Sequence, residues 1–185
     1  MAQAAKLKAF FTEGNVPPGG ICLSSFVVLT TGKDVLVGKM SKPSIWVERF
    51  YVGEQFIPRY ISSGKYILPA SHLAWYESPL DAAERVVKEQ TLLPLNREHL
   101  KLVGVQSHLA GDPSNKDEPP HWDICFVYQG KVPKKLAKNL KKPEWFDEFG
   151  FVERSRLTPD HFTRGHGDVL HHANAIGKSA TKKKK

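Results

Sequence analysis

Hydrophobic positions in the first third of the chain fall into short runs that are typical of β-strands. Residues 21–30 and 35–40 are rich in aliphatic and β-branched side chains, and Thr31-Gly32-Lys33-Asp34 between them predicts a hairpin turn. Residues 45–61 are aromatic and also β-prone, although a glycine and a proline interrupt them. Further strands are predicted at residues 100–109, 124–128 and 149–153.

One segment in the middle of the chain instead has helical spacing. A helix is predicted from Pro79 to about Thr91, because apolar and small residues recur there on one side: Leu80, Ala83, Val87 and Thr91. Ser78 can cap this helix, Pro79 suits its first position, and Asp81 favours the positive end of its dipole. Pro94 then ends the segment.

The rest of the chain adds shorter helices and one irregular loop. The loop GDPSNKDEPPHW is rich in glycine, proline and acidic residues, and residues 133–142 form a short basic segment with some helical character. A C-terminal helical region is predicted from Thr158 to about Ala175, broken near Gly165 or Gly167. Mixed strands with one central and one terminal helix favour an α/β or α+β sandwich.

Composition bounds the class of protein. A length of 185 residues with 41% hydrophobic residues predicts one domain with a real core. No long uncharged apolar run indicates a membrane span, and the N-terminal residues do not have the pattern of a signal peptide. Cys22 and Cys125 both lie in apolar runs, which predicts two buried thiols in a reducing, cytoplasmic compartment; a disulfide between them is the alternative.

The net charge of +8 depends strongly on the last residues of the chain. Without Lys178 and the four lysines at positions 182–185, the formal charge falls to +3. We expect residues 177–185 to be a disordered tail, because they have no apolar periodicity and repel one another. A second basic segment lies at residues 131–142, so RNA is a possible partner through the lysine-rich segments, whereas solvated surface is the simpler reading.

Residues 68–91, LPASHLAWYESPLDAAERVVKEQT, carry the most informative pattern. Glu77 follows a turn, and Arg85 and Glu89 lie on the predicted helix. This spacing resembles the Nudix box, G-x5-E-x7-R-E-U-x-E-E-x-G-U, in which U is apolar. In that comparison Glu77 matches the first glutamate, Arg85 the arginine, and Glu89 the first of the paired glutamates.

Four positions depart from the family pattern. Ser71 replaces the first box glycine, and Leu92 replaces the last. Val86 and Gln90 replace two glutamates that, with Glu89, would lie within roughly 100° on one helix face. Valine offers no ligand to a metal, and an amide offers an oxygen without negative charge.

The resemblance implies a Nudix-like α/β/α sandwich with a central mixed sheet over residues 20–176, preceded by an N-terminal extension at residues 1–19. It also implies recognition of a nucleotide or other organic diphosphate, and Mg²⁺- or Mn²⁺-dependent hydrolysis if the protein is active. Glu89 and Glu77 would then bind metal, and Glu77 with Arg85 would order the loop. The predicted substrate-binding residues are Asp117, Glu118, His121 and Trp122.

The alternative function is a non-catalytic binding or assembly module for RNA, nucleotide or protein, which needs no cofactor and explains the substitutions directly. An acid of the irregular loop, such as Asp112, is a further candidate metal ligand. A homodimer is also possible, as in many relatives. The histidines at positions 161, 166, 171 and 172 lack a compact zinc-binding spacing, so we expect them to have polar or capping roles.

Overall fold

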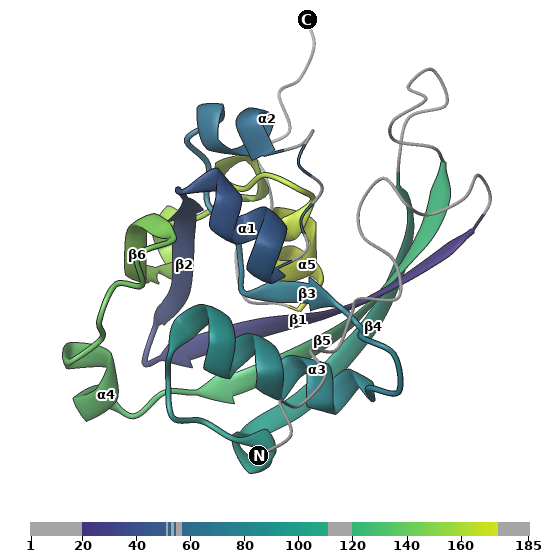
Figure 1. The fold of residues 1–185 in the computed structure, drawn as a ribbon. Coiled ribbons are helices and arrows are strands. Elements are labelled where there is room, and N and C mark those ends of the chain that lie inside the picture. Colours follow the sequence, from purple (N-terminus) through teal and green to yellow (C-terminus); the bar gives the residue numbers. More distant parts are fainter. Residues whose placement is uncertain (1–19, 51, 53, 55–56, 111–119, 174–185) are drawn as a thin grey trace, which may run out of the picture.

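The computed structural model describes residues 20–173, apart from residues 51, 53, 55, 56 and 111–119. Within this part the chain forms a mixed sheet of six strands with helices around it (Figure 1). The strand order is β4-β5-β1-β2-β6, and β3 pairs separately with β1. The β1–β5 pair is parallel and the other pairs are antiparallel. The strands are β1 (Ile21–Thr31), β2 (Asp34–Met40), β3 (Ala70–His72), β4 (Leu100–Ala110), β5 (His121–Lys131) and β6 (Phe146–Glu153).

The predicted hairpin at the start of the sheet is confirmed. Thr31 pairs with Asp34, so that Gly32 and Lys33 form a two-residue turn. Gly32 has a φ of 58°, as the first central residue of a primed hairpin turn requires. Glycine adopts this conformation without a steric penalty, which is why the turn falls at this point of the sequence.

The aromatic segment after this hairpin is helical, so the prediction of β-structure at residues 45–61 is wrong. The segment contains α1 (Pro43–Phe50) and α2 (Ile57–Ser62). Trp46 and Phe50, four residues apart, are both buried on one side of α1, and Ile57 and Tyr60 are buried on α2. Burial of large rings at helical spacing therefore outweighs their strand propensity.

The central helix begins as the sequence predicts. In α3 (Pro79–Val86), Ser78 is the N-cap, and its hydroxyl oxygen accepts a hydrogen bond of 3.2 Å from the Asp81 amide. The helix then continues as a π-helical turn over Val87–Thr91. It ends at Leu92, whose φ of 59° and ψ of 16° place it in the left-handed region. The chain therefore leaves the helix before Pro94.

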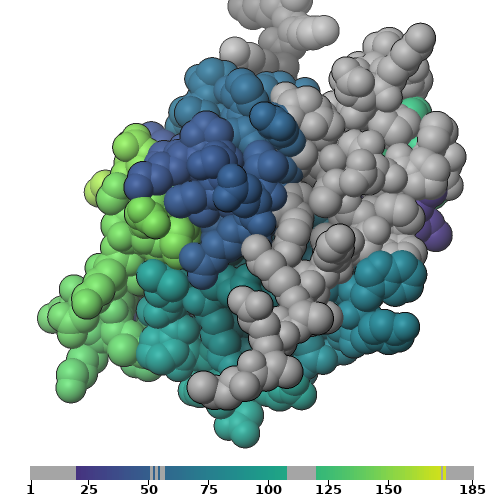
Figure 2. Space-filling view, in the orientation of Figure 1, coloured from purple at the N-terminus to yellow at the C-terminus, as the bar shows by residue number. Residues whose placement is uncertain are grey.

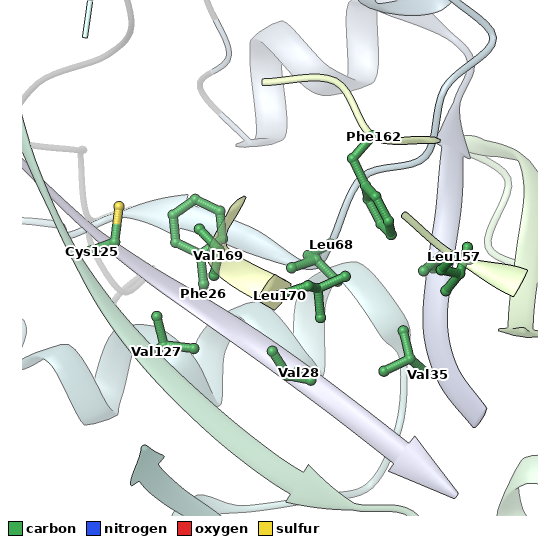
Figure 3. Close-up of a cluster of buried hydrophobic side chains, with 11 residues drawn as sticks. Phe26, Val28, Val35, Leu68, Cys125, Val127, Leu157, Phe162, Val169 and Leu170 are labelled. Carbon is green, nitrogen blue, oxygen red and sulfur yellow. The ribbon is translucent and has the colours of Figure 1, made fainter. Parts of the chain in front are cut away.

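The sheet separates two apolar layers, because successive residues of β1 point to opposite faces. Val27 and Leu29 pack with Ala83 of α3 and with Val87 of the π-helical turn that follows it. Phe26 and Val28 lie in a second cluster with Val169 and Leu170 of α5 (His166–His172), which Figure 3 shows in close-up. The resulting order of helix, mixed sheet and helix is the predicted α/β architecture.

The basic segment, the C-terminal region and the cysteines can also be compared with the sequence predictions. The short basic segment contains α4 (Lys134–Lys138), and the C-terminal region is broken at Gly165, the left-handed residue before α5. His121 and Trp122 begin β5 and are not part of an irregular loop. The two cysteines are buried and form no disulfide, and burial raises the pKa of Cys125 to about 12. Predictions for residues 1–19, 111–119 and 174–185 lie outside the described residues.

No helix in the described part of the chain is both long and apolar enough to cross a membrane.

Candidate functional site

The loop between β3 and α3 is held by an ion pair between Glu77 and Arg85. The Arg85 Nε atom donates to Glu77 Oε1 at 2.7 Å, and its Nη2 atom donates to Glu77 Oε2 at 2.8 Å. The two side chains are largely buried, with exposed fractions of 19% for Arg85 and 4% for Glu77. Two parallel charge-assisted bonds in a partly dry setting fix the orientation of both groups. Arg85 pairs with Glu77 across the loop, and not with Glu89 one turn further along the helix.

The same two residues also fasten the loop backbone. Glu77 Oε2 accepts a hydrogen bond of 2.8 Å from the Ala74 amide, and Arg85 Nη2 donates to the His72 carbonyl oxygen at 2.9 Å. Arg85 Nη1 lies 3.4 Å from the Ser71 hydroxyl oxygen. Ser71 belongs to β3, and neither it nor Ala70 has a positive φ, so the missing glycine causes no strain there. The ordering role expected for this pair therefore has its geometry in place.

Val86 belongs to the hydrophobic core. Its exposed fraction is 1%, and it lies in the apolar cluster that joins α3 to the sheet. Val27 and Leu29 of β1 are members of the same cluster. A carboxylate at this position would sit among apolar groups and away from water, where an unpaired charge is very unfavourable. The local packing thus matches valine and not the glutamate of the family pattern.

Gln90 has a structural role that its position in the box does not reveal. Its side chain is buried, with an exposed fraction of 1%. Its Nε2 atom donates to the Ala70 carbonyl oxygen at 2.8 Å, and its Oε1 atom accepts from the Ala70 amide at 3.1 Å. The Trp145 indole donates to the Gln90 carbonyl oxygen at 3.0 Å. Gln90 therefore joins the helix to β3 and to the segment before β6 by neutral hydrogen bonds.

Among the described residues, these contacts leave a single carboxylate on this helix face to hold a divalent cation. Both oxygens of Glu77 accept hydrogen bonds, and both polar atoms of the Gln90 amide are paired. Glu89 is half-buried and has no ion pair among the described residues, so it is the one carboxylate of the helix face that is available. Within the described residues, no group of three or more His, Cys, Asp or Glu side chains could hold a metal. A hard cation such as Mg²⁺ prefers several oxygen ligands and usually one or two carboxylates.

Exposed aromatic rings lie on this same loop, and the sequence argument did not single them out. Trp75 is 53% exposed and Tyr76 is fully exposed, with ring centroids 6.2 Å apart. The predicted Trp122 is 51% exposed at the start of β5, beside His121, whereas Asp117 and Glu118 lie outside the described residues. The signal that would have found the loop rings is a pair of adjacent aromatic residues in the short stretch between β3 and a capped helix.

The C-terminal histidines include two with clear local roles. His161 Nδ1 accepts a hydrogen bond of 3.0 Å from the Thr158 amide and caps a short 3-10 turn. His166 Nδ1 accepts a hydrogen bond of 2.8 Å from the Leu68 amide, and its ring packs edge-on against Phe26. Burial lowers the pKa of His166 well below its usual value, and the charge of Arg164 lowers it further. His161 therefore has a capping role, as expected from the sequence, whereas His166 is buried and packs against Phe26.

A helix–sheet–helix sandwich with a glutamate–arginine pair ordering the loop before its central helix is the arrangement that the sequence resemblance implies. The NUDIX domain family model matches residues 24–173, and the chain belongs to this family. No protein of curated function matches the sequence.

Solved structures share the fold of this chain at low sequence identity. The chain is 15% identical to a MutT protein from Methanosarcina mazei, with a TM-score of 0.54, covering 84% of this chain and 94% of that one. A mutT/nudix family protein from Listeria innocua is 21% identical, with a TM-score of 0.53 and coverages of 83% and 90%. A bifunctional NMN adenylyltransferase/ADP ribose pyrophosphatase from Francisella tularensis, in complex with AMP and a manganese ion, is 13% identical with a TM-score of 0.52. The match covers 85% of this chain but only 42% of that protein.

Proposed function

We propose that this Nudix-family chain is a non-catalytic binding module that recognises a nucleotide or another organic diphosphate. The observation that carries the proposal is the pair of hydrogen bonds between Gln90 and Ala70. These bonds use a position that belongs to the metal face in the family pattern to hold the fold together. With Val86 in the core, two of the three acidic positions on that face are committed to structure.

The binding part of the proposal rests on the β3–α3 loop, where Glu77 and Arg85 match the family pattern. Glu77 and Arg85 fix the loop backbone, and the loop presents Trp75 and Tyr76 to solvent. Exposed rings offer a surface on which a nucleobase can stack, with a contribution of about 1–3 kcal/mol per base. An ordered loop that carries exposed aromatic residues is therefore suited to bind a nucleotide without cleaving it. Trp122, together with His121, is the candidate for a further contact.

The competing function is metal-dependent hydrolysis, and one observation favours it. Glu89 has no ion pair within the described residues, and Mg²⁺ can be bound by one or two carboxylates together with substrate phosphates. Hydrolysis would then require acidic ligands from outside the box. The acids named in the sequence analysis, Asp112, Asp117 and Glu118, belong to residues 111–119, which lie outside the described part of the chain.

One experiment separates the two functions. Nucleoside diphosphates linked to sugars or to second nucleosides are titrated calorimetrically into the full chain and assayed for phosphate or nucleotide release, with Mg²⁺, with Mn²⁺ and with a chelator. We expect saturable binding that survives chelation, no turnover, and no loss of affinity in Glu89→Gln. Trp75→Ala should weaken binding by roughly tenfold or more, as the loss of one stacking contact implies.

Two results would overturn this proposal. Metal-dependent release that disappears in Glu89→Gln would establish a hydrolase with ligands from elsewhere in the chain. Absence of binding to every nucleotide, from protein that is folded by circular dichroism, would remove the nucleotide as ligand.

A further inference from the structure

A lysine-lined cavity lies between the β1–β2 turn and α4. In Figure 1 this turn and α4 lie at the opposite end of the sheet from the β3–α3 loop. Its volume is about 480 Å³. Lys33 of the turn and Lys134 and Lys138 of α4 contribute the positive groups, and Asp34 contributes the acidic one. Ala137 and Phe151 provide apolar surface. The cavity thus combines an excess of positive charge with a patch suited to a flat apolar group.

The turn that forms one wall is held in place from β6. Arg154, which follows this strand, donates from Nε to the Lys33 carbonyl oxygen at 3.0 Å and from Nη2 to the Gly32 carbonyl oxygen at 3.1 Å. The Arg154 backbone amide donates to the same Lys33 oxygen at 3.2 Å. The backbone of Lys33 is therefore fixed, so the root of its side chain has a defined position.

The cavity lysines have no charge partner among the described residues, unlike three lysines elsewhere in the fold. Lys33, Lys134 and Lys138 are exposed, and their side chains form no ion pair within the described residues. Elsewhere three lysines pair with glutamates at 2.6–2.8 Å: Lys39 with Glu148, Lys42 with Glu144, and Lys88 with Glu84. Uncompensated positive charge beside a cavity attracts anions.

The positive charge extends beyond the cavity along the same segment. Lys131, Lys135 and Lys141 are also exposed and have no ion pair in the described part of the chain. Figure 2 shows this segment (green) standing out from the body of the molecule at the lower left. A row of cations along a protruding element matches an extended polyanion better than a single phosphate group.

We propose that this cavity and the lysines of residues 131–141 bind single-stranded RNA. The three cavity lysines contact successive backbone phosphates, and the apolar surface of Phe151 and Ala137 receives a base. RNA is favoured over inorganic polyphosphate because polyphosphate has no group that would use this apolar surface. The proposal is independent of nucleotide binding at the β3–α3 loop, because it involves none of the same residues.

The test is the salt dependence of binding between the full chain and a labelled single-stranded oligouridylate, measured by fluorescence anisotropy. The variant carries Lys33→Gln, Lys134→Gln and Lys138→Gln together. The matched control carries Lys65→Gln, Lys88→Gln and Lys101→Gln, which remove the same charge from exposed positions elsewhere. Both proteins keep the lysines of residues 178–185, so any contribution from those residues is the same in each.

The logarithm of the binding constant falls linearly with the logarithm of the salt concentration, with a slope of about 0.7 for each phosphate contact to a single strand. We expect the cavity variant, which loses three such contacts, to reduce the magnitude of this slope by about 2. This change corresponds to about a hundredfold weaker binding at 0.1 M salt, whereas the control triple changes it much less. In the wild-type chain, RNA should also protect Lys33, Lys134 and Lys138 from acetylation. This second measurement uses no variant, so it does not depend on whether a variant folds.

Equal losses in the two triple variants, or acetylation of the cavity lysines that RNA does not slow, would overturn the site. RNA would be overturned as the ligand if inorganic polyphosphate of the same charge bound as tightly and Phe151→Leu left RNA affinity unchanged. Mononucleotide binding in the cavity variant should equal that of the wild type, so failure here is distinct from failure of the proposed nucleotide site.

Discussion

The Gln90 side chain and the Ala70 backbone form a closed pair of hydrogen bonds, of 2.8 Å and 3.1 Å, that joins the central helix to β3. This arrangement requires a side chain that both donates and accepts. A carboxylate can only accept, and would face the Ala70 carbonyl oxygen with a second negative oxygen. The replacement of glutamate by glutamine is thus part of the packing of this fold.

Gln90→Glu should therefore destabilise the protein although it restores the family residue. We expect a loss of about 3 kcal/mol in the free energy of unfolding at pH 8, because a buried charge and an unpaired carbonyl are both unfavourable. Burial raises the pKa of a carboxyl group, and the protonated form can donate to Ala70, so the loss should be smaller at pH 5. Urea denaturation at the two pH values measures both effects.

The control is Glu89→Gln, the same isosteric exchange in reverse at the neighbouring position. Glu89 has no ion pair in the described residues, so its substitution should change stability by no more than about 0.5 kcal/mol. Similar effects of the two substitutions would contradict the role assigned to Gln90.

Arg85→Lys tests whether the loop depends on the geometry of the pair or only on its charge. Lysine keeps the positive charge, but its ammonium group cannot make the two parallel bonds to Glu77 or reach all the partners of Arg85. We expect a loss of about 2 kcal/mol in unfolding free energy. The amides of residues 72–78 should exchange hydrogen faster, whereas those of β5 should change only in proportion to global stability.

Lys88→Arg provides the matched exchange in the opposite direction at an exposed ion pair of the same helix. It should leave both stability and loop exchange close to wild type. An Arg85→Lys protein with wild-type exchange in the loop would show that charge alone is enough to order it.

The sequence predicted those features that depend on local spacing. The hairpin turn at Gly32, the cap at Ser78 and the apolar side of α3 follow from short-range patterns, and all three are confirmed. The same patterns misassigned residues 45–61, because strand propensity and helical spacing of large rings compete in that segment. The outcome depended on Trp46 and Phe50 packing with Trp145 and Phe146, residues about a hundred positions away.

The site shows the same division between local and long-range information. The pairing of Glu77 with Arg85 was expected from the family pattern and is present. The role of Gln90 was not, because it depends on the Ala70 backbone twenty residues earlier and on a π-helical turn. Sequence spacing placed Gln90 beside Glu89 on the predicted metal face and did not reveal which atoms its side chain meets.

The stability of the protein should fall as the pH is lowered from about 6.5 toward 5, and His166 should account for part of the loss. Its Nδ1 atom accepts from the Leu68 amide, so protonation would place two donors against each other. Burial and the charge of Arg164 keep its pKa in the folded state well below the usual value. An unfolded histidine titrates near pH 6.5, so below that pH the unfolded chain binds more protons and becomes relatively more stable.

The measurement is the free energy of unfolding at several pH values for the wild type and for His166→Asn. Asparagine offers an oxygen near the position of Nδ1 but has no titration in this range. We expect its overall stability to be lower, because the ring packing against Phe26 is lost, but its pH dependence to be flatter by up to about 1.4 kcal/mol per pH unit. Parallel pH profiles for the two proteins would assign the acid sensitivity to other groups.

Leu92→Gly should stabilise the protein, because Leu92 is an exposed residue held in the left-handed conformation. A side chain with a Cβ atom costs about 1–2 kcal/mol in this region, whereas glycine adopts it freely at the end of a helix. The gain is reduced by the greater freedom of glycine in the unfolded chain, so we expect a net increase of about 1 kcal/mol in unfolding free energy. Leu92→Ala is the control, because it shortens the side chain but keeps the Cβ atom and should bring no such gain. A stabilisation of the same size in both variants would mean that it comes from removing the exposed leucine side chain, and not from removing strain in the left-handed backbone.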